Sequence, residues 1–373
     1  SWSYTASVTN GTTYQFNVKE TDLAGNTSDP TSNFTVTVDT IVPSVSLVTG
    51  TITASGNAVV QSTETGTVYL VNTSVTVSNL ASITGAADNL WNSVTISSPS
   101  TPTNLSVVGL DGLHKAYAVD YAGNLSSASS TVVDVDGVIP SVTSVAITSA
   151  SVKQNNFLNA GDNVSMTVNF SETVILDNTG GPPVLTIVVG STDRPTTYIS
   201  GSNSDNLTFL YTIQAGENDT DGISISANAL ELPTNTTLKD STGNIASLTH
   251  DAVTHNAEYK VDTTTPSVSS FTMSDTEIKI GDTPTVTLAF SEAVIGFSSS
   301  ADITIASLDN GTASGSLSTM SSTDNESWTG TFTPTANTED ATNTLSLAIN
   351  SYTDLAGNNG PAATTANYEI DTL

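Results

Sequence analysis

The chain of 373 residues contains no cysteine, which excludes disulfide bridges, zinc–thiolate sites and cysteine nucleophiles. Basic residues are scarce as well. Seven Lys and Arg stand against 36 Asp and Glu, and the formal net charge is −29. Such a surface repels nucleic acid and anionic lipid, because both are bound through Lys and Arg, and it attracts cations instead. We therefore expect no nucleic-acid partner.

Long apolar runs are also missing. The longest of them, such as 184–189, are far too short to span a bilayer, so we expect no direct insertion into a membrane. No secretion signal is visible. Because the sequence starts inside a repeated pattern, we interpret it as an excerpt from a longer protein.

Catalytic signatures are equally sparse. The only histidines are His114, His250 and His255, and no motif sets one of them beside a nucleophile and a supporting acid. There is no Gly-rich loop of the kind that cradles phosphate. We therefore expect neither an enzyme nor an organic cofactor.

What the chain does contain is a short motif, Asp-x-x-Gly-Asn, that occurs four times. Each copy is followed by a strand-like run and then by another aspartate, and three of these later aspartates open a phrase with proline four residues on. The motif copies are 22–26, 120–124, 240–244 and 354–358, and the later aspartates are Asp39, Asp136, Asp262 and Asp371. A period of roughly a hundred residues predicts a tandem array.

The repeats divide the chain into one partial and three complete units. We predict the C-terminal part of a repeat at 1–40, a repeat at 41–138, a longer repeat at 139–264 and a repeat at 265–373. Proline restricts its own backbone and that of the residue before it, so the joints should be short and stiff.

Alternation of period two dominates the pattern and predicts strands such as 164–170 and 286–290. We expect three strands in the first segment (2–8, 12–20 and 34–38) and a single helical turn at 227–232. The stretch 85–105 fits no clear pattern. Short strands separated by frequent turn signals favour an all-β protein built of β-sandwiches.

A glutamate recurs early in each complete repeat, after the expected second strand: Glu64, Glu172 and Glu292. Together, the phrases Asp-x-Ala-Gly-Asn, Val-Asp-Thr-x-x-Pro and Phe-Ser-Glu-x-Val resemble the bacterial immunoglobulin-like (Big) tandem repeats of giant type I-secreted adhesins, the RTX, BapA-like and SiiE-like biofilm proteins. The resemblance implies immunoglobulin-like sandwiches of seven strands arranged end to end in an elongated rod, and export to the bacterial cell surface. In several members it also implies calcium at the domain joints. Repeat 41–138 departs from the pattern, with Ser-Thr-Glu where the others have Phe-Ser-Glu.

In an immunoglobulin-type sandwich, the loop after the second strand and the loop between the last two strands lie at one end. The chain also enters there, so three oxygen-bearing elements should converge at each joint. The predicted metal ligands are Asp39, Glu64, Asp120 and Asn124 at the first joint, Asp136, Glu172, Asp240 and Asn244 at the second, and Asp262, Glu292, Asp354 and Asn358 at the third. Clustered carboxylates repel one another unless a cation intervenes, and hard oxygen ligands favour Ca²⁺.

Two acidic motifs also have simpler interpretations, in which neither binds a metal ion. The Asp-x-x-Gly-Asn motif could be only a tight turn closed by an Asx hydrogen bond, with the later aspartate a polar linker residue. Separately, the stretch 217–222 resembles the start of an Asp-x-Asp-x-Asp-Gly calcium loop, but the closing glutamate is absent, and a solvated turn is the alternative.

The pattern as a whole indicates a structural stalk segment of an extracellular bacterial adhesin, stiffened by Ca²⁺ at its joints. Its partners would be neighbouring repeats of the same chain, and the unknown adhesion ligand would be bound elsewhere in the full protein. One alternative is a module that binds a glycan, a peptide or ice, with the long repeat 139–264 as the best host. Another is a subunit of a surface filament, in which strands from another chain complete 1–40.

Overall fold

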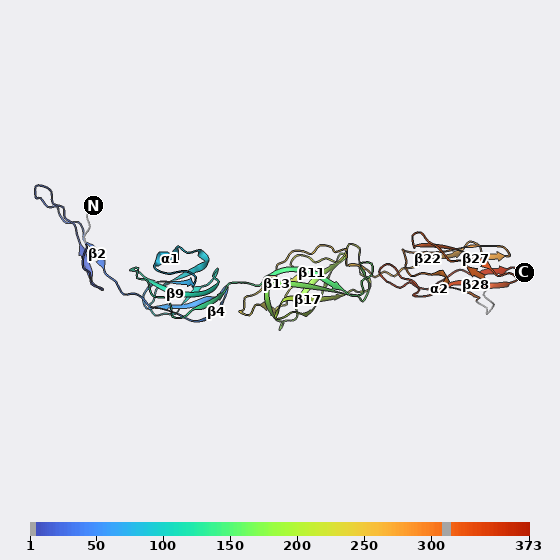
Figure 1. Cartoon of the computed structure of the whole chain (residues 1–373), viewed down its shortest axis with the longest axis horizontal. Helices are drawn as coiled ribbons and strands as arrows, with labels where there is room; N and C mark the ends of the chain where they lie inside the picture. Colours follow the sequence, from blue (N-terminus) through green and yellow to red (C-terminus); the bar gives the residue numbers. More distant parts are fainter. Residues whose placement is uncertain (1–4, 308–314) are drawn as a thin grey trace. The chain divides into compact units, whose positions relative to one another are not determined.

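The computed structural model describes residues 5–307 and 315–373 (Figure 1). Nearly all of its regular secondary structure is β. The chain forms two compact units, the first comprising Ser1–Pro140 with Leu238–Ser247 and the second Ser141–Thr237 with Leu248–Leu373. The expected all-β architecture of tandem immunoglobulin-like sandwiches is confirmed.

The sandwich of the first unit has sheets of five and three strands. The larger sheet has the order β4 (Gly50–Thr53), β10 (Val133–Asp136), β9 (Gly112–Asp120), β6 (Gly66–Asn72) and β7 (Trp91–Ile96). The smaller contains β3 (Val45–Leu47), β5 (Asn57–Ser62) and β8 (Thr103–Ser106). Alternate residues of these strands face inward and form one apolar cluster that includes Val60, Val68, Leu70 and Leu105.

The second unit begins with three sheets. The first contains β11 (Val142–Ala150), β13 (Asn163–Asp177), β17 (Ser204–Thr212) and β16 (Thr197–Ser200). The others are β12 (Phe157–Leu158), β21 (Lys260–Asp262) and β18 (Asn218–Asp219), and then β15 (Thr192–Pro195), β14 (Val184–Val189) and β19 (Leu230–Glu231). The short strand β20 (Thr237–Lys239) ends just before Asp240.

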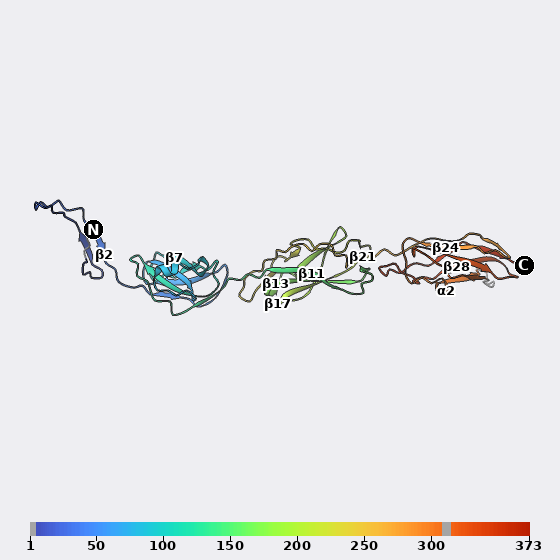
Figure 2. The same ribbon diagram turned by 45° about the horizontal axis from the view of Figure 1, so that its top comes forward.

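The same unit continues with a further two-layered sandwich, whose layers are visible in Figures 1 and 2. One layer is β22 (Val268–Met273), β24 (Thr285–Phe290), β27 (Ser327–Pro334) and β26 (Gly315–Leu317). The other is β23 (Glu277–Lys279), β30 (Tyr368–Asp371), β28 (Glu339–Leu347) and β25 (Ile303–Ser307), with β29 (Ala363–Thr364) beside β28. Leu288, Phe332, Leu345 and Tyr368 pack between the layers.

A divided first strand recurs three times. Its first half pairs antiparallel in one sheet, as β3–β5, β11–β13 and β22–β24. Its second half crosses to the other sheet and pairs parallel with the last strand, as β4–β10, β12–β21 and β23–β30. The last residues of these final strands are Asp136, Asp262 and Asp371, so the topology fixes where each recurrent aspartate leaves its sheet.

The first forty residues form fewer strands than expected. Among residues 5–40, the only paired strands are those of the hairpin β1 (Thr13–Phe16) and β2 (Phe34–Thr37). Of the predicted strand 2–8, residues 2–4 lie outside the described residues, and 5–8 are not extended into a ladder. Phe34 is 69% exposed, so this hairpin buries little apolar surface.

Helix predictions from the sequence were wrong at two places. The expected turn at 227–232 is instead strand β19, because Asn228 takes a positive φ of 57° and Leu230 pairs with Leu185. Conversely, α1 (Leu80–Thr84) was not expected. Asn79 and Ser82 cap this helix reciprocally, and its buried Ile83 anchors it.

The unassigned stretch 85–105 contains η1 (Asp88–Leu90) as well as β7 and the start of β8. The only other helix among the described residues is α2 (Ser299–Asp302).

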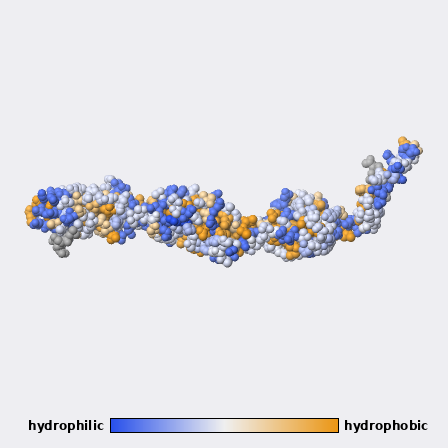
Figure 3. All heavy atoms as spheres, turned by 180° about the vertical axis from the view of Figure 1, so that it is seen from behind, coloured by the Kyte–Doolittle hydropathy of each residue, from blue (hydrophilic) through white to orange (hydrophobic). Residues whose placement is uncertain are grey.

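The face in Figure 3 is mostly covered by residues of neutral or polar hydropathy, with apolar residues in small groups. Within residues 5–307 and 315–373, no helix has the length and apolar character needed to cross a bilayer.

A buried histidine gives the first unit a predicted pH dependence. His114 on β9 is fully buried, and burial lowers its pKa below the ordinary 6.5, although the Gly112 carbonyl and the charges of Asp111 and Asp134 partly oppose that shift. The folded state therefore keeps His114 neutral, while the unfolded chain takes up a proton as pH falls below about 6.5. Unfolding free energy should then decrease with falling pH.

We expect the opening free energy of β9, measured by amide hydrogen exchange and corrected for intrinsic rates, to be lower at pH 5.5 than at pH 7.5. In His114→Gln this difference should shrink, because the variant has no proton to gain at that position. An undiminished difference in the variant would contradict the prediction.

Candidate functional site

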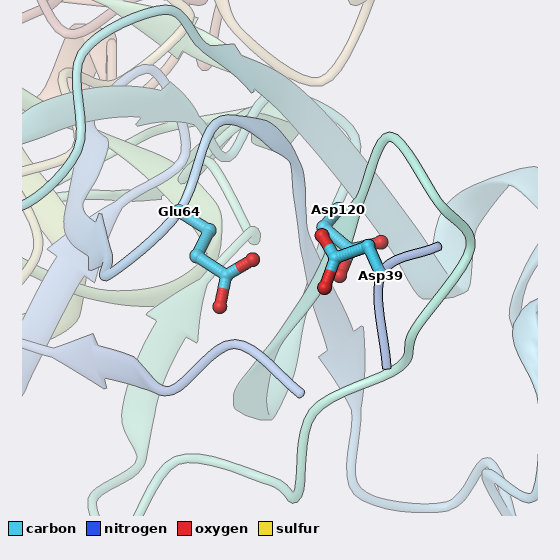
Figure 4. Close-up of side chains that lie close together, drawn as sticks. All are labelled: Asp39, Glu64 and Asp120. Carbon is cyan, nitrogen blue, oxygen red and sulfur yellow. The ribbon is translucent and has the colours of Figure 1, made fainter. Parts of the chain in front are cut away.

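Two groups of three carboxylates form within residues 5–307 and 315–373. The first triad is Asp39, Glu64 and Asp120 in the first unit, and the second triad is Asp262, Glu292 and Asp354 in the second unit. In each triad, one oxygen from every residue lies within 4.8 Å of the other two. Figure 4 shows the carboxylates of Asp39 and Asp120 side by side, with that of Glu64 directed toward them.

The fold brings these residues together from three separate elements. Glu64 and Glu292 follow the second strands β5 and β24, as the sequence predicted, and Asp120 and Asp354 open Asp-x-x-Gly-Asn turns. The third member of each triad is the aspartate before the proline, at the point where the chain enters the sandwich. The triads therefore join a linker to two loops that are distant from it in sequence.

The Asp-x-x-Gly-Asn turn is closed by its own aspartate. In the second triad, Asp354 Oδ1 accepts hydrogen bonds from the backbone of Ala356 (2.8 Å) and Asn358 (2.9 Å), and Oδ2 accepts one from Asn358 Nδ2 (2.8 Å). Gly357 has a φ of 90°, a backbone conformation that side chains with a Cβ rarely adopt. The motif is therefore an Asx turn in its internal geometry. One carboxylate oxygen of its aspartate also lies within the triad.

The motif asparagine also holds the linker. Asn124 Nδ2 donates to the carbonyl of Asp39 (3.2 Å), and Asn358 Nδ2 donates to the carbonyl of Asp262 (2.9 Å). The same nitrogens donate to the turn aspartates, at 2.8 Å in both cases. We call this pair of hydrogen bonds the Asn bridge. The sequence had suggested the asparagines as oxygen ligands, whereas the contacts seen in the structure are made by their amide nitrogens.

The second joint is divided between the two units. Asp136, Asp240 and Asn244 belong to the first unit, and Glu172 belongs to the second, within β13 rather than after it. Asn244 Nδ2 donates to Asp240 Oδ2 (2.8 Å) and to the carbonyl of Asp136 (3.1 Å), which repeats the Asn bridge. Its Oδ1 accepts a hydrogen bond from the backbone of Ala54 (2.7 Å). A metal site shared with Glu172 stays a prediction.

Electrostatics distinguish the two glutamates from Asp120. Burial raises the pKa of Glu64, and the charges of Asp39 and Asp120 raise it further. The pKa of Glu292 is raised in the same way, by burial first and then by Asp354, Asp262 and Glu326. Burial also acts to raise the pKa of Asp120, but hydrogen bonds from Asn124 and the turn backbone outweigh it and lower that pKa. Each triad thus contains carboxylates whose mutual repulsion a cation would relieve.

Two contacts at the second triad had no clear signal in the sequence. Asn155 Nδ2 donates to the carbonyl of Leu355 (2.9 Å), and Asn159 Nδ2 donates to that of Ala356 (3.2 Å). Asn155 precedes β12 and Asn159 follows it, and both are far from the motif in sequence. They attach the chain on either side of β12 to backbone carbonyls of the 354–358 turn.

The acidic stretch 217–222 has the geometry of a closed turn. Asp219 is 2% exposed, and its two oxygens accept hydrogen bonds from the backbone of Gly190 and Gly222, both at 2.7 Å. Glu217 is paired with Arg194 and accepts a hydrogen bond from Tyr211. These contacts favour the structural alternative over a calcium loop.

The histidines have structural contacts. His250 Nε2 accepts a hydrogen bond from the backbone of Ala229 (2.9 Å), and His255 Nδ1 lies 3.1 Å from the carbonyl of Gly222. Neither contact resembles a nucleophile held by a base. The expectation that the chain is not an enzyme stays a prediction.

Comparisons with known proteins give one family match and several distant structural similarities. Residues 262–370, which contain the second triad, match the family model of a bacterial Ig-like domain. No curated protein sequence matches the chain. The Escherichia coli adhesin FdeC is similar over 88% of this chain and 96% of its own, at 11% identity and a TM-score of 0.31.

Two other bacterial structures are similar at the same level. Invasin, an integrin-binding protein, matches 89% of this chain and 60% of its own, at 14% identity and a TM-score of 0.26. The D00–D0 domains of intimin match over 62% of this chain and 100% of their own, at 11% identity and a TM-score of 0.21. These scores are low, and no conclusion about function follows from them. The similarity to a bacterial Ig-like domain extends over residues 262–370.

The Asn bridge leads to a stability prediction. Asn358→Ala removes the donor to Asp354, whose side chain is fully buried, and to the Asp262 carbonyl. We expect the local free energy of opening, measured by hydrogen exchange of the 354–358 turn, to fall by about 1–3 kcal/mol.

The matched control is Asn26→Ala. Asn26 Nδ2 donates to Asp22 Oδ2 (3.0 Å) in an exposed turn, and this bond is the counterpart of the Asn358 bond to Asp354. There we expect a change within about 0.5 kcal/mol, because water replaces the lost donor. Equal losses at the two turns would show that burial of the bridge contributes nothing.

Proposed function

We propose that this chain is a stalk segment of an extracellular bacterial adhesin, and that each carboxylate triad binds one Ca²⁺ ion at a joint between repeats. The observation that carries the proposal is the recurrence of the triad. Asp39, Glu64 and Asp120 reproduce the arrangement of Asp262, Glu292 and Asp354, although the linker residue in each case comes from the preceding repeat. The bacterial Ig-like match at 262–370 supports the adhesin class.

The donor set fits calcium. Each triad supplies three carboxylates with no sulfur or imidazole among them, and Ca²⁺ accepts six to eight oxygens in a flexible geometry. Backbone carbonyls and water would complete the shell. Mg²⁺ demands a tighter octahedron and dehydrates reluctantly, so it suits such a loose group of carboxylates less well. When bound, the ion would supply the positive charge that these clusters lack.

The triads would couple ion binding to the stiffness of a joint. A bound ion would link the linker carboxylate, Asp39 or Asp262, to two loops of the repeat that follows. Without the ion, three negative charges would repel one another, and the Asn bridge would be left to hold the linker. The ion would thus restrict bending of a linker that proline already restricts.

The expected energy per joint is modest. Extracellular calcium modules often bind with dissociation constants of about 10⁻⁴ to 10⁻³ M. At a tenfold excess over the dissociation constant, one site adds roughly 1.4 kcal/mol to the ion-bound state. In an array, such contributions accumulate, because stability is approximately a sum over units and interfaces.

Calcium titration of the whole chain by isothermal calorimetry tests the assignment. We expect at least two sites with dissociation constants of about 10⁻⁴ to 10⁻³ M. Glu64→Gln and Glu292→Gln should each remove or weaken one site about tenfold or more, because each deletes a charged ligand. Glu231→Gln, an exposed glutamate on β19, is the control and should bind as the parent does. Absence of calcium binding by the parent chain would refute the proposal.

Small-angle scattering tests the mechanical part. The whole chain should become more flexible, with a changed maximum dimension, when calcium is replaced by chelator at constant ionic strength. The variant carrying both Glu64→Gln and Glu292→Gln should scatter in calcium nearly as the parent does in chelator. If calcium does not change the scattering of the parent chain, then calcium binding does not stiffen the joints.

A further inference from the structure

A group of polar atoms is buried in the core of the sandwich formed by 268–371, away from the second triad. Asn343 is fully buried, Tyr368 is 1% exposed and Asp340 is 8% exposed. Among the residues that the structure describes, each has a side-chain polar atom without a hydrogen-bond partner: Asn343 Oδ1, Tyr368 Oη and Asp340 Oδ2. Three such atoms on two paired strands call for an explanation, because buried polar atoms are nearly always paired.

The strand register places these atoms on one face. Asn343 on β28 lies directly opposite Tyr368 on β30, and Asp340 lies opposite Ile370. Tyr368 and Ile370 are two residues apart on β30, so both point to the same side of the sheet, and both are buried. A register shift between Asp340 and Asn343 inserts a bulge in β28, and bulges re-aim side chains.

The other polar atoms of these residues are already used. Asn343 Nδ2 donates to the carbonyls of Asp340 (3.0 Å) and Tyr368 (3.2 Å), and Asp340 Oδ1 accepts from the backbone of Thr342 (3.0 Å). What remains is two acceptors, Asp340 Oδ2 and Asn343 Oδ1, and one hydroxyl donor, Tyr368 Oη. The hydroxyl of Thr342, in the bulge, is also buried without a partner.

We propose that Asp340, Asn343 and Tyr368 form an internal site for one ordered water molecule that joins β28 to β30. Water donates two hydrogen bonds and accepts two, and buried waters typically make about three. It would donate to Asp340 Oδ2 and Asn343 Oδ1 and accept from Tyr368 Oη, which satisfies all three groups. The Thr342 hydroxyl is available as a fourth partner.

The count of hydrogens favours water over a cation. A metal ion would take lone pairs from all three oxygens and would leave the phenolic hydrogen of Tyr368 with no acceptor in an apolar core. The phenol keeps that hydrogen, because burial and the charge of Asp340 both raise the pKa of Tyr368. The site therefore differs in chemistry from the carboxylate triads, and it would fasten the strand that leads to Asp371.

Crystals of the whole chain, grown in calcium and in chelator, test the proposal. We expect one density peak at about 2.6–3.2 Å from Asp340 Oδ2, Asn343 Oδ1 and Tyr368 Oη, unchanged by chelator and without anomalous signal. Three results would each overturn it: no peak, a direct hydrogen bond between Tyr368 and Asp340, or a peak with oxygen distances near 2.4 Å and a calcium anomalous signal.

Variants give an independent measurement. Tyr368→Phe should lower the folding equilibrium constant about 5- to 30-fold. Combined with Asp340→Ala, it should lower the constant by less than the product of the two separate factors, because both changes act on the same water. Tyr352→Phe is the control, since that buried hydroxyl bonds directly to the Pro361 carbonyl (3.1 Å), and its effect should multiply with that of Asp340→Ala.

Independent, multiplying effects of Tyr368→Phe and Asp340→Ala would overturn the shared site. If Asp340→Ala fails to fold, the density in the crystal of the parent chain decides the question.

Discussion

At each of three joints, one asparagine side-chain nitrogen holds the linker against the turn. In three copies of the Asp-x-x-Gly-Asn turn, the asparagine Nδ2 donates both to the carboxylate that closes the turn and to the carbonyl of the linker aspartate. This Asn bridge needs no ion. It fixes the backbone of the linker beside the turn and thereby brings the linker carboxylate toward the glutamate of the neighbouring loop.

The cost of that arrangement is electrostatic. Hydrogen bonds from the asparagine amide hold the linker beside two other carboxylates. Burial raises the pKa values of Glu64 and Glu292, and the charges of the neighbouring carboxylates raise them further. Calcium would convert this repulsion into attraction. The buried water site proposed in the sandwich of 268–371 follows the opposite rule, because its one carboxylate is balanced by hydroxyl and amide groups, and hydrogen bonding suffices there.

Much of this could be predicted from the sequence, and the failures have physical causes. Period-two alternation located β13 and β24, and the recurrent motif located the turns. The helix α1 escaped prediction because its capping by Asn79 and a single buried Ile83 give no helical periodicity. The helical turn predicted at 227–232 was wrong, because the positive φ of Asn228 and the pairing of Leu230 with Leu185 are set by tertiary contacts. A sequence motif likewise cannot predict whether the oxygen or the nitrogen of the Asn124 amide contacts Asp120.

The repeat and the residues of the two triads could be predicted from spacing, because the loops at one end of a sandwich lie together, and the acidic charge follows from composition. Strand register and packing decide that asparagine bridges by its nitrogen, that Glu172 lies within a strand, and that Asp340, Asn343 and Tyr368 share one buried face. Those outcomes depend on register and on a bulge, and both are set by packing between strands far apart in the chain.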